Sequence, residues 1–151
     1  MKYLISIFVL TALMVTSSCN SENRKGEVNS EGVTKKTEER VRPAASGGTS
    51  AAYFTYINTL SVADTIVSVS SPQAGMAQLH ESYETEDGLM GMREQKNVVI
   101  QPEESITFQQ GGLHIMLMQL NEDLTKGDSV LVEIELEQAG VISRVIPVKE
   151  N

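Results

Sequence analysis

The strongest constraint on the fold of this chain is a series of short, largely alternating apolar segments separated by turn residues. The segments span residues 51–58, 64–70, 76–82, 97–101, 105–109, 111–120, 129–137 and 141–148. Turn signals such as Ser71-Pro72, Gly111-Gly112 and Lys126-Gly127 lie between them. Alternation presents one face of each strand to a core, and seven or eight such strands are typical of an antiparallel β-sandwich. No segment has a convincing helical period, so the sequence predicts an all-β fold.

The first 42 residues do not follow this pattern and predict two separate segments. In residues 1–18, Lys2 is followed by a short apolar run, and small residues then lead up to Cys19. This arrangement is typical of a lipoprotein signal peptide, and the run is shorter than the roughly 20 residues of a membrane-spanning helix. We expect a lipidated Cys19, a polar tether over residues 19–42 and a folded domain over residues 43–151. The alternative is an ordinary cleaved signal with an incidental cysteine.

The charge and the cysteine content exclude several classes of function. A formal net charge of −8 is unsuited to nucleic acid, which requires clustered Lys and Arg. Membrane attachment would have to come through Cys19. This cysteine is the only one in the chain, so the folded domain can form neither a disulfide nor a thiolate metal site. A folded domain without thiols fits an oxidising compartment, so we expect an exported protein in the periplasm. We also expect it to be a monomer.

Both His and five of the seven Met are confined to less than half of the expected domain. They are Met76, His80, Met90, Met92, His114, Met116 and Met118. Methionine used only to fill a core would be scattered among the strands. Thioether sulfur is a soft, neutral donor that selects Cu(I), and imidazole also binds copper. The clustering therefore predicts a Cu(I) site, whereas two His without Cys argue against zinc.

The spacing of four of these residues carries a family resemblance. Met92 follows His80 by twelve residues, and His114 and Met116 form a His-x-Met pair a further twenty-two residues on. This pattern, with the segments AAYFTYIN, GLMGMR, QQGGLHIMLM and LTKGDSV, resembles the periplasmic copper chaperone family PCu(A)C. Glu81 stands where that family has an optional Met.

The resemblance implies a cupredoxin-like Greek-key sandwich that binds one Cu(I) through His80, Met92, His114 and Met116. It also implies delivery of copper toward the CuA centre of cytochrome oxidase, often alongside a Sco-type protein. Met90 could be an accessory ligand, although a hydrophobic plug over the sandwich end is the alternative. Met118 is expected in the core, and Met76 in core or edge packing.

Other functions have weaker support in the sequence. It contains no nucleophile elbow and no glycine-rich phosphate loop, so we expect binding and transfer of copper instead of catalysis. The acidic cluster at 84–87 lacks the spacing of a calcium loop and is interpreted as a solvated turn. The rival hypothesis is a β-sandwich lipoprotein without metal that serves as an adhesion or assembly module. Ligand side chains that converge near solvent would favour copper, and dispersed side chains would favour the rival.

Overall fold

The computed structural model describes residues 38–150, so the predicted signal peptide and Cys19 lie outside the described residues. Within this range the chain forms ten strands and no helix. Accordingly, residues 38–150 contain no helix that is long and apolar enough to cross a bilayer. The strands are β1 (Arg40–Val41), β2 (Thr49–Ile57), β3 (Asp64–Ser70), β4 (Ala74–Glu84), β5 (Met90–Glu94), β6 (Val98–Ile100), β7 (Ser105–Phe108), β8 (Leu113–Leu120), β9 (Ser129–Leu136) and β10 (Gly140–Pro147).

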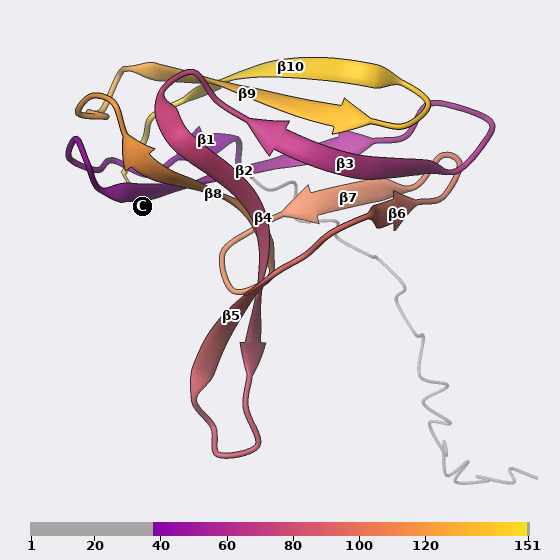
Figure 1. Cartoon of the computed structure of the whole chain (residues 1–151), viewed down its shortest axis with the longest axis horizontal. Coiled ribbons are helices and arrows are strands. Elements are labelled where there is room, and N and C mark those ends of the chain that lie inside the picture. The colour runs from indigo at the N-terminus through magenta and orange to yellow at the C-terminus, as the bar shows by residue number, and fades with distance from the viewer. Residues whose placement is uncertain (1–37, 151) are drawn as a thin grey trace, which may run out of the picture. The chain divides into compact units, whose positions relative to one another are not determined.

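The strands form two sheets that pack as a sandwich (Figure 1). The larger sheet has the order β1-β2-β8-β4-β5, with β7 also paired to β2, and the smaller has the order β10-β9-β3-β6. All pairings between named strands are antiparallel, and many neighbours are distant in sequence. This architecture confirms the predicted all-β antiparallel sandwich.

The core lies between the sheets and is built from the alternating residues of facing strands. The rings of Phe54 and Phe108 pack against each other, tilted by 45° with centroids 4.7 Å apart, and Ile134 from the smaller sheet is fully buried in the same cluster. Strand β8 contributes Ile115 and Leu117, which are both fully buried. Because successive side chains on a strand alternate between faces, His114, Met116 and Met118 lie on the outer face of this sheet.

Two strands differ from the sequence-based expectations. Arg40–Val41 pairs with β2 and Val41 is fully buried, so β structure begins before the expected boundary at Pro43. Met90–Glu94 forms β5, although none of the strand segments predicted from sequence covers these residues. Its residues are exposed or half-buried, so no alternation of burial marks them as a strand. These residues are recognised as a strand only because they pair with β4.

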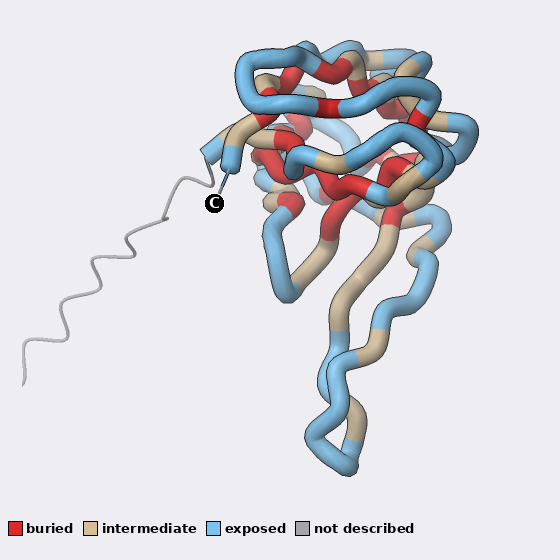
Figure 2. The backbone as a smooth tube through the Cα atoms, turned by 90° about the vertical axis from the view of Figure 1, so that its left-hand side faces the viewer, coloured by how far each residue is buried: buried red, intermediate tan, exposed pale blue. Residues whose placement is uncertain are grey.

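Strands β4 and β5 continue together beyond the sandwich as a hairpin (Figure 1). The buried part of the backbone ends where this hairpin leaves the sheets, and its tip is exposed (Figure 2). The base of the hairpin adjoins β8, and this junction is where the two histidines meet.

Candidate metal centre

The two histidines are direct cross-strand partners at the base of the hairpin. His80 on β4 pairs with His114 on β8, so both side chains leave the same face of the sheet. Their ring centroids are 6.3 Å apart and the rings are tilted by 57°. An ion bound between two imidazoles at about 2 Å from each nitrogen would separate the ring centroids by about 6 Å. The spacing therefore suits one ion held by both rings.

The strand register places the remaining predicted ligands on this same outer face. Met116 pairs with Gln78, one alternate position along from the His pair and about 6.6 Å away along the strand. Met92 on β5 pairs with Ser82, one alternate position in the opposite direction. His80, His114 and Met116 are thus on adjacent strands of the sheet. Met92 lies further out, on the hairpin, and is 61% exposed.

His114 is oriented by the turn that precedes its strand. Its side chain is only 4% exposed, and Nδ1 lies 2.8 Å from the carbonyl oxygen of Gly112. A carbonyl only accepts hydrogen bonds, so Nδ1–H donates and Nε2 keeps its lone pair for a metal. The same carbonyl accepts the backbone N–H of Ser82, which fixes the turn against β4. Gly111 has φ +78°, as the predicted tight turn requires.

His80 is half-buried and has its own polar neighbour. Its Nε2 lies 3.1 Å from Oε1 of Gln78, so Nε2–H can donate to that amide and leave Nδ1 as the metal donor. Burial lowers the pKa of His80, and the neighbouring His114 lowers it further, while Glu94 acts in the opposite direction. The net shift favours the neutral imidazole, which is the form that binds a metal.

On the opposite face of the hairpin, Glu81 takes part in a network of hydrogen bonds. Glu81 accepts hydrogen bonds from Arg93, at 2.7 Å, and from Gln95, at 2.8 Å. The Arg93 guanidinium lies 5.2 Å from the Tyr83 ring centroid, and Tyr83 in turn covers Gly91, where a Cβ would come within 2.7 Å of the ring. Glu81, at the optional position of the family pattern, is therefore directed away from the His pair and is engaged with Arg93.

The other methionines lie on the same outer face as the His pair. Met90 pairs with Glu84 near the hairpin tip and is 66% exposed, so it does not plug the end of the sandwich. Met118 pairs with Met76. The expectation that Met118 belongs to the core is wrong, because it is half-buried on the outer face and absent from the core cluster. Met76 is 45% exposed.

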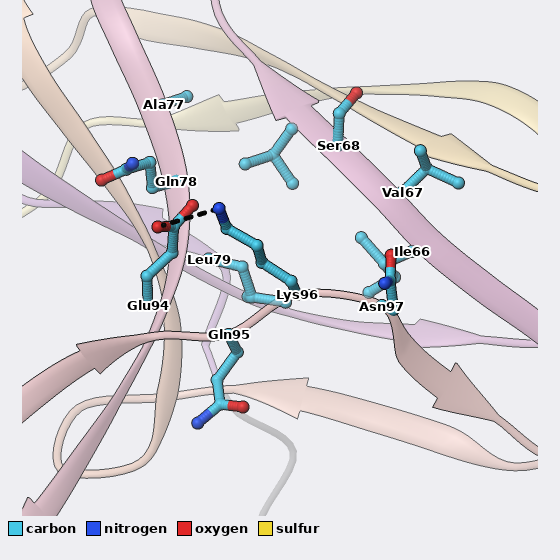
Figure 3. Close-up of a pocket in the computed structure, with 11 residues that line it drawn as sticks. Ile66, Val67, Ser68, Ala77, Gln78, Leu79, Glu94, Gln95, Lys96 and Asn97 are labelled. Carbon is cyan, nitrogen blue, oxygen red and sulfur yellow. Dashed lines mark ion pairs between the residues drawn. The ribbon is translucent and has the colours of Figure 1, made fainter.

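A separate cavity of about 310 Å³ lies between β3, β4 and the segment that follows β5 (Figure 3). Ile66, Leu79 and Lys96 are among its lining residues, and Lys96 lies 3.6 Å from Glu94. Neither His nor Met lines it, although Gln78, the hydrogen-bond partner of His80, is one of its lining residues.

The donor set on the outer face suits a soft ion. Within residues 38–150 no group of three His, Cys, Asp or Glu side chains is placed to hold a metal. Any ion bound at the His pair must therefore draw on thioether sulfur, water or an amide for further ligands. Sequence reasoning missed the supporting roles of Gly112 and Gln78. The signal for Gln78 was its position two residues before His80 on a strand, which places both on one face.

Comparison with known sequences identifies lipoproteins. The family model described as "Putative lipoprotein LpqE-like" matches residues 35–148. The curated protein "Putative lipoprotein Lxx21020" from Leifsonia xyli subsp. xyli is 33% identical over 108 residues, which is 71% of this chain and 64% of that protein. The chain thus spans just under two thirds of the length of that relative.

Comparison with solved structures finds PCuAC domains that have the same β-sandwich fold as residues 38–150 of this chain. The apo PCuAC domain from PmoF1 has a TM-score of 0.59 at 22% identity, covering 77% of this chain and 95% of that domain. The copper-bound PCuAC domain from PmoF2 has a TM-score of 0.59 at 17% identity, covering 76% and 92%. The solution structure of CuI-DR1885 from Deinococcus radiodurans has a TM-score of 0.56 at 25% identity, covering 75% and 77%. The described sandwich is therefore cupredoxin-like.

Proposed function

The chain belongs to the LpqE-like lipoprotein family, and from this premise we propose that it is a periplasmic Cu(I) carrier anchored through Cys19. His80, Met92, His114 and Met116 would bind the ion, with Met90 as a possible accessory ligand. The observation that carries the proposal is the direct pairing of His80 with His114 on the face that also presents Met92 and Met116. Two solved relatives of the same fold are described as copper-bound or CuI forms, which supports copper as the cargo.

The arrangement suits transfer better than permanent storage. His114 is buried and fixed by Gly112, whereas Met92 is largely exposed on the hairpin. A partner protein could replace the exposed thioether first and then take the ion from the histidines. We propose a copper-binding acceptor protein as the partner, by family resemblance the CuA subunit of cytochrome oxidase with a Sco-type protein. The reaction is exchange of ligands on Cu(I), without catalysis of a covalent step.

The test is an anaerobic titration of the purified protein with Cu(I) in the presence of a strong Cu(I)-specific chelator. We expect the parent protein to retain one equivalent. His114→Ala and Met116→Leu remove one donor each, so we expect affinity to fall at least as much as the roughly 10- to 100-fold typical of losing an outer-shell partner. Met116→Leu keeps the side-chain volume, which separates ligand loss from misfolding.

Glu81→Gln is the matched control, because Glu81 neighbours His80 in sequence but engages Arg93 on the opposite face. Its affinity for Cu(I) is expected to equal that of the parent. Unchanged binding in both His114→Ala and Met116→Leu would refute the site. A parent protein that retains no Cu(I) would favour the rival function, a lipoprotein adhesion or assembly module without metal.

A transfer assay tests the acceptor separately. The Cu(I)-loaded protein is mixed with an isolated CuA domain, with or without a Sco-type protein, and the copper content of each is measured after separation. Transfer to the CuA domain supports the proposed partner. Retention of copper on the carrier under both conditions would refute that partner without affecting the binding site.

A further inference from the structure

We propose that Met76 and Met118 form a second Cu(I) station beside the first, sharing Met116 with it. The inference rests on the proposed function for the identity of the metal. It concerns two residues that the four-ligand pattern leaves unused.

The register of β4 and β8 makes these two methionines direct partners. Met76 pairs with Met118, Gln78 pairs with Met116, and His80 pairs with His114. Cross-strand partners have Cβ atoms about 5 Å apart, and alternate positions along a strand are about 6.6 Å apart. The thioethers of Met76, Met118 and Met116 therefore start from three neighbouring points on one face. Met side chains have three rotatable bonds, so their sulfur atoms can converge on one ion.

Packing does not account for the Met76–Met118 pair. Met76 is 45% exposed, and Met118 is half-buried outside the core cluster. An exposed position within a sheet is better served by β-branched or polar side chains than by flexible Met. Thr49, the partner of Met118 on β2, offers no charged group. Three neutral thioethers without a carboxylate among their cross-strand partners select a soft monovalent ion over a harder one.

The position of the pair implies a route for the ion. The Met76–Met118 pair and the His80–His114 pair lie on either side of the Gln78–Met116 pair. Met116 can therefore bind an ion at either station, which would let Cu(I) move along β8 by exchanging one ligand at a time. An all-thioether station lacks the imidazole donors, so we expect it to bind more weakly than the first.

The experiment is a pair of anaerobic Cu(I) titrations of the purified protein, one with a strong competing chelator and one with a weak competitor. We expect one equivalent bound under strong competition and two under weak competition. Met76→Leu/Met118→Leu is expected to lose only the second equivalent. Val145→Leu, an exposed apolar change on β10 in the other sheet, is the matched control and is expected to retain both. Melting curves of the variants check that the fold persists.

The assignment to individual side chains comes from NMR of the protein labelled at its Met methyl groups. The Met76 and Met118 methyl signals are expected to move with the second equivalent. Binding of a single equivalent by the parent under weak competition would overturn the second station and leave the proposed function intact. Two equivalents in Met76→Leu/Met118→Leu would also overturn it. Absence of any Cu(I) binding would overturn both proposals together.

Discussion

At the scale of single residues, Asp64 shows how one buried carboxylate supports a turn remote from the candidate centre. Asp64 starts β3 and accepts backbone N–H bonds from Thr65, Gln138 and Ala139, at 2.8 to 2.9 Å. Burial opposes its ionisation, but these N–H donors more than compensate and lower the pKa of Asp64 below its ordinary value of 3.8. The charged form therefore stabilises the turn between β9 and β10.

Asp64→Asn is expected to lower the free energy of unfolding at neutral pH by about 1.5–3 kcal/mol, as for the loss of hydrogen bonds to a charged group. Because the folded-state pKa is depressed, the stabilisation is fully present above the ordinary pKa and is lost as pH falls through the folded value. Urea unfolding of parent and variant from pH 7 to pH 2 measures the difference, which we expect to shrink below pH 4. Asp87→Asn, in the exposed hairpin tip, is the control. If the difference in free energy of unfolding between parent and Asp64→Asn stays constant with pH, the charge of Asp64 does not stabilise the fold.

At the scale of strands, the β4–β5 hairpin is packed into the core at its base and exposed to solvent along β5. Leu79 anchors β4 in the core, whereas Met90, Met92 and Arg93 on β5 are exposed. The Arg93–Glu81 ion pair is solvent-exposed, so it adds little to stability. Opening of the hairpin therefore requires much less free energy than opening of the sandwich.

Amide hydrogen exchange tests this contrast. Without copper, the amides of β5 are expected to exchange about 100-fold or more faster than those of Ile115 and Leu117 in β8. Cu(I) is expected to slow exchange in β5, because ligation of Met92 would hold the hairpin to the His pair. The amides of β10 serve as an internal control and are expected to be unaffected. If Cu(I) protects β8 but not β5, Met92 is not a ligand.

Strands whose burial alternates clearly are the easiest to predict from sequence. Strand β9 is the clearest case, because exposed or half-buried residues alternate there with buried Val130, Val132 and Ile134. Strand β5 has no core-facing side, and β1 has only two residues, so neither leaves a readable period. The interpretation of Met118 went wrong for a related reason. Alternation places Met116 and Met118 on one face of β8, but it cannot tell which face the second sheet covers.

The candidate centre was accessible to sequence analysis only in part. The resemblance to the copper chaperone family selected His80, Met92, His114 and Met116, and the register places all four on one face. The pairing of His80 with His114 requires β4 and β8 to be neighbours in the sheet. In the sequence, three other strands separate β4 from β8. Likewise, the hydrogen bond from His114 to Gly112 depends on the turn geometry. Long-range pairing and turn geometry are what composition and spacing do not specify.

At the scale of the whole molecule, the proposed binding of copper and the proposed attachment to the membrane are assigned to separate segments of the chain. Every proposed ligand lies in the sandwich or its hairpin, whereas Cys19 precedes the described residues. A net charge of −8 gives the protein no electrostatic attraction to anionic lipid, so acyl chains on Cys19 would have to supply the affinity. Each buried CH₂ of such a chain contributes about 0.8 kcal/mol.

Cys19→Ser is accordingly expected to move the exported protein from the membrane fraction to the soluble fraction, without changing its affinity for Cu(I). Fractionation of cells, followed by immunoblotting and by the chelator titration, measures both properties in the same preparation. Ser21→Ala alters a nearby polar residue while keeping Cys19, and it is expected to remain in the membrane fraction. If Cys19→Ser also remains there although residues 1–18 have been cleaved, as its size on the immunoblot reports, Cys19 is not the attachment site. A loss of Cu(I) affinity in Cys19→Ser would instead mean that the segment before the sandwich contributes to the metal centre.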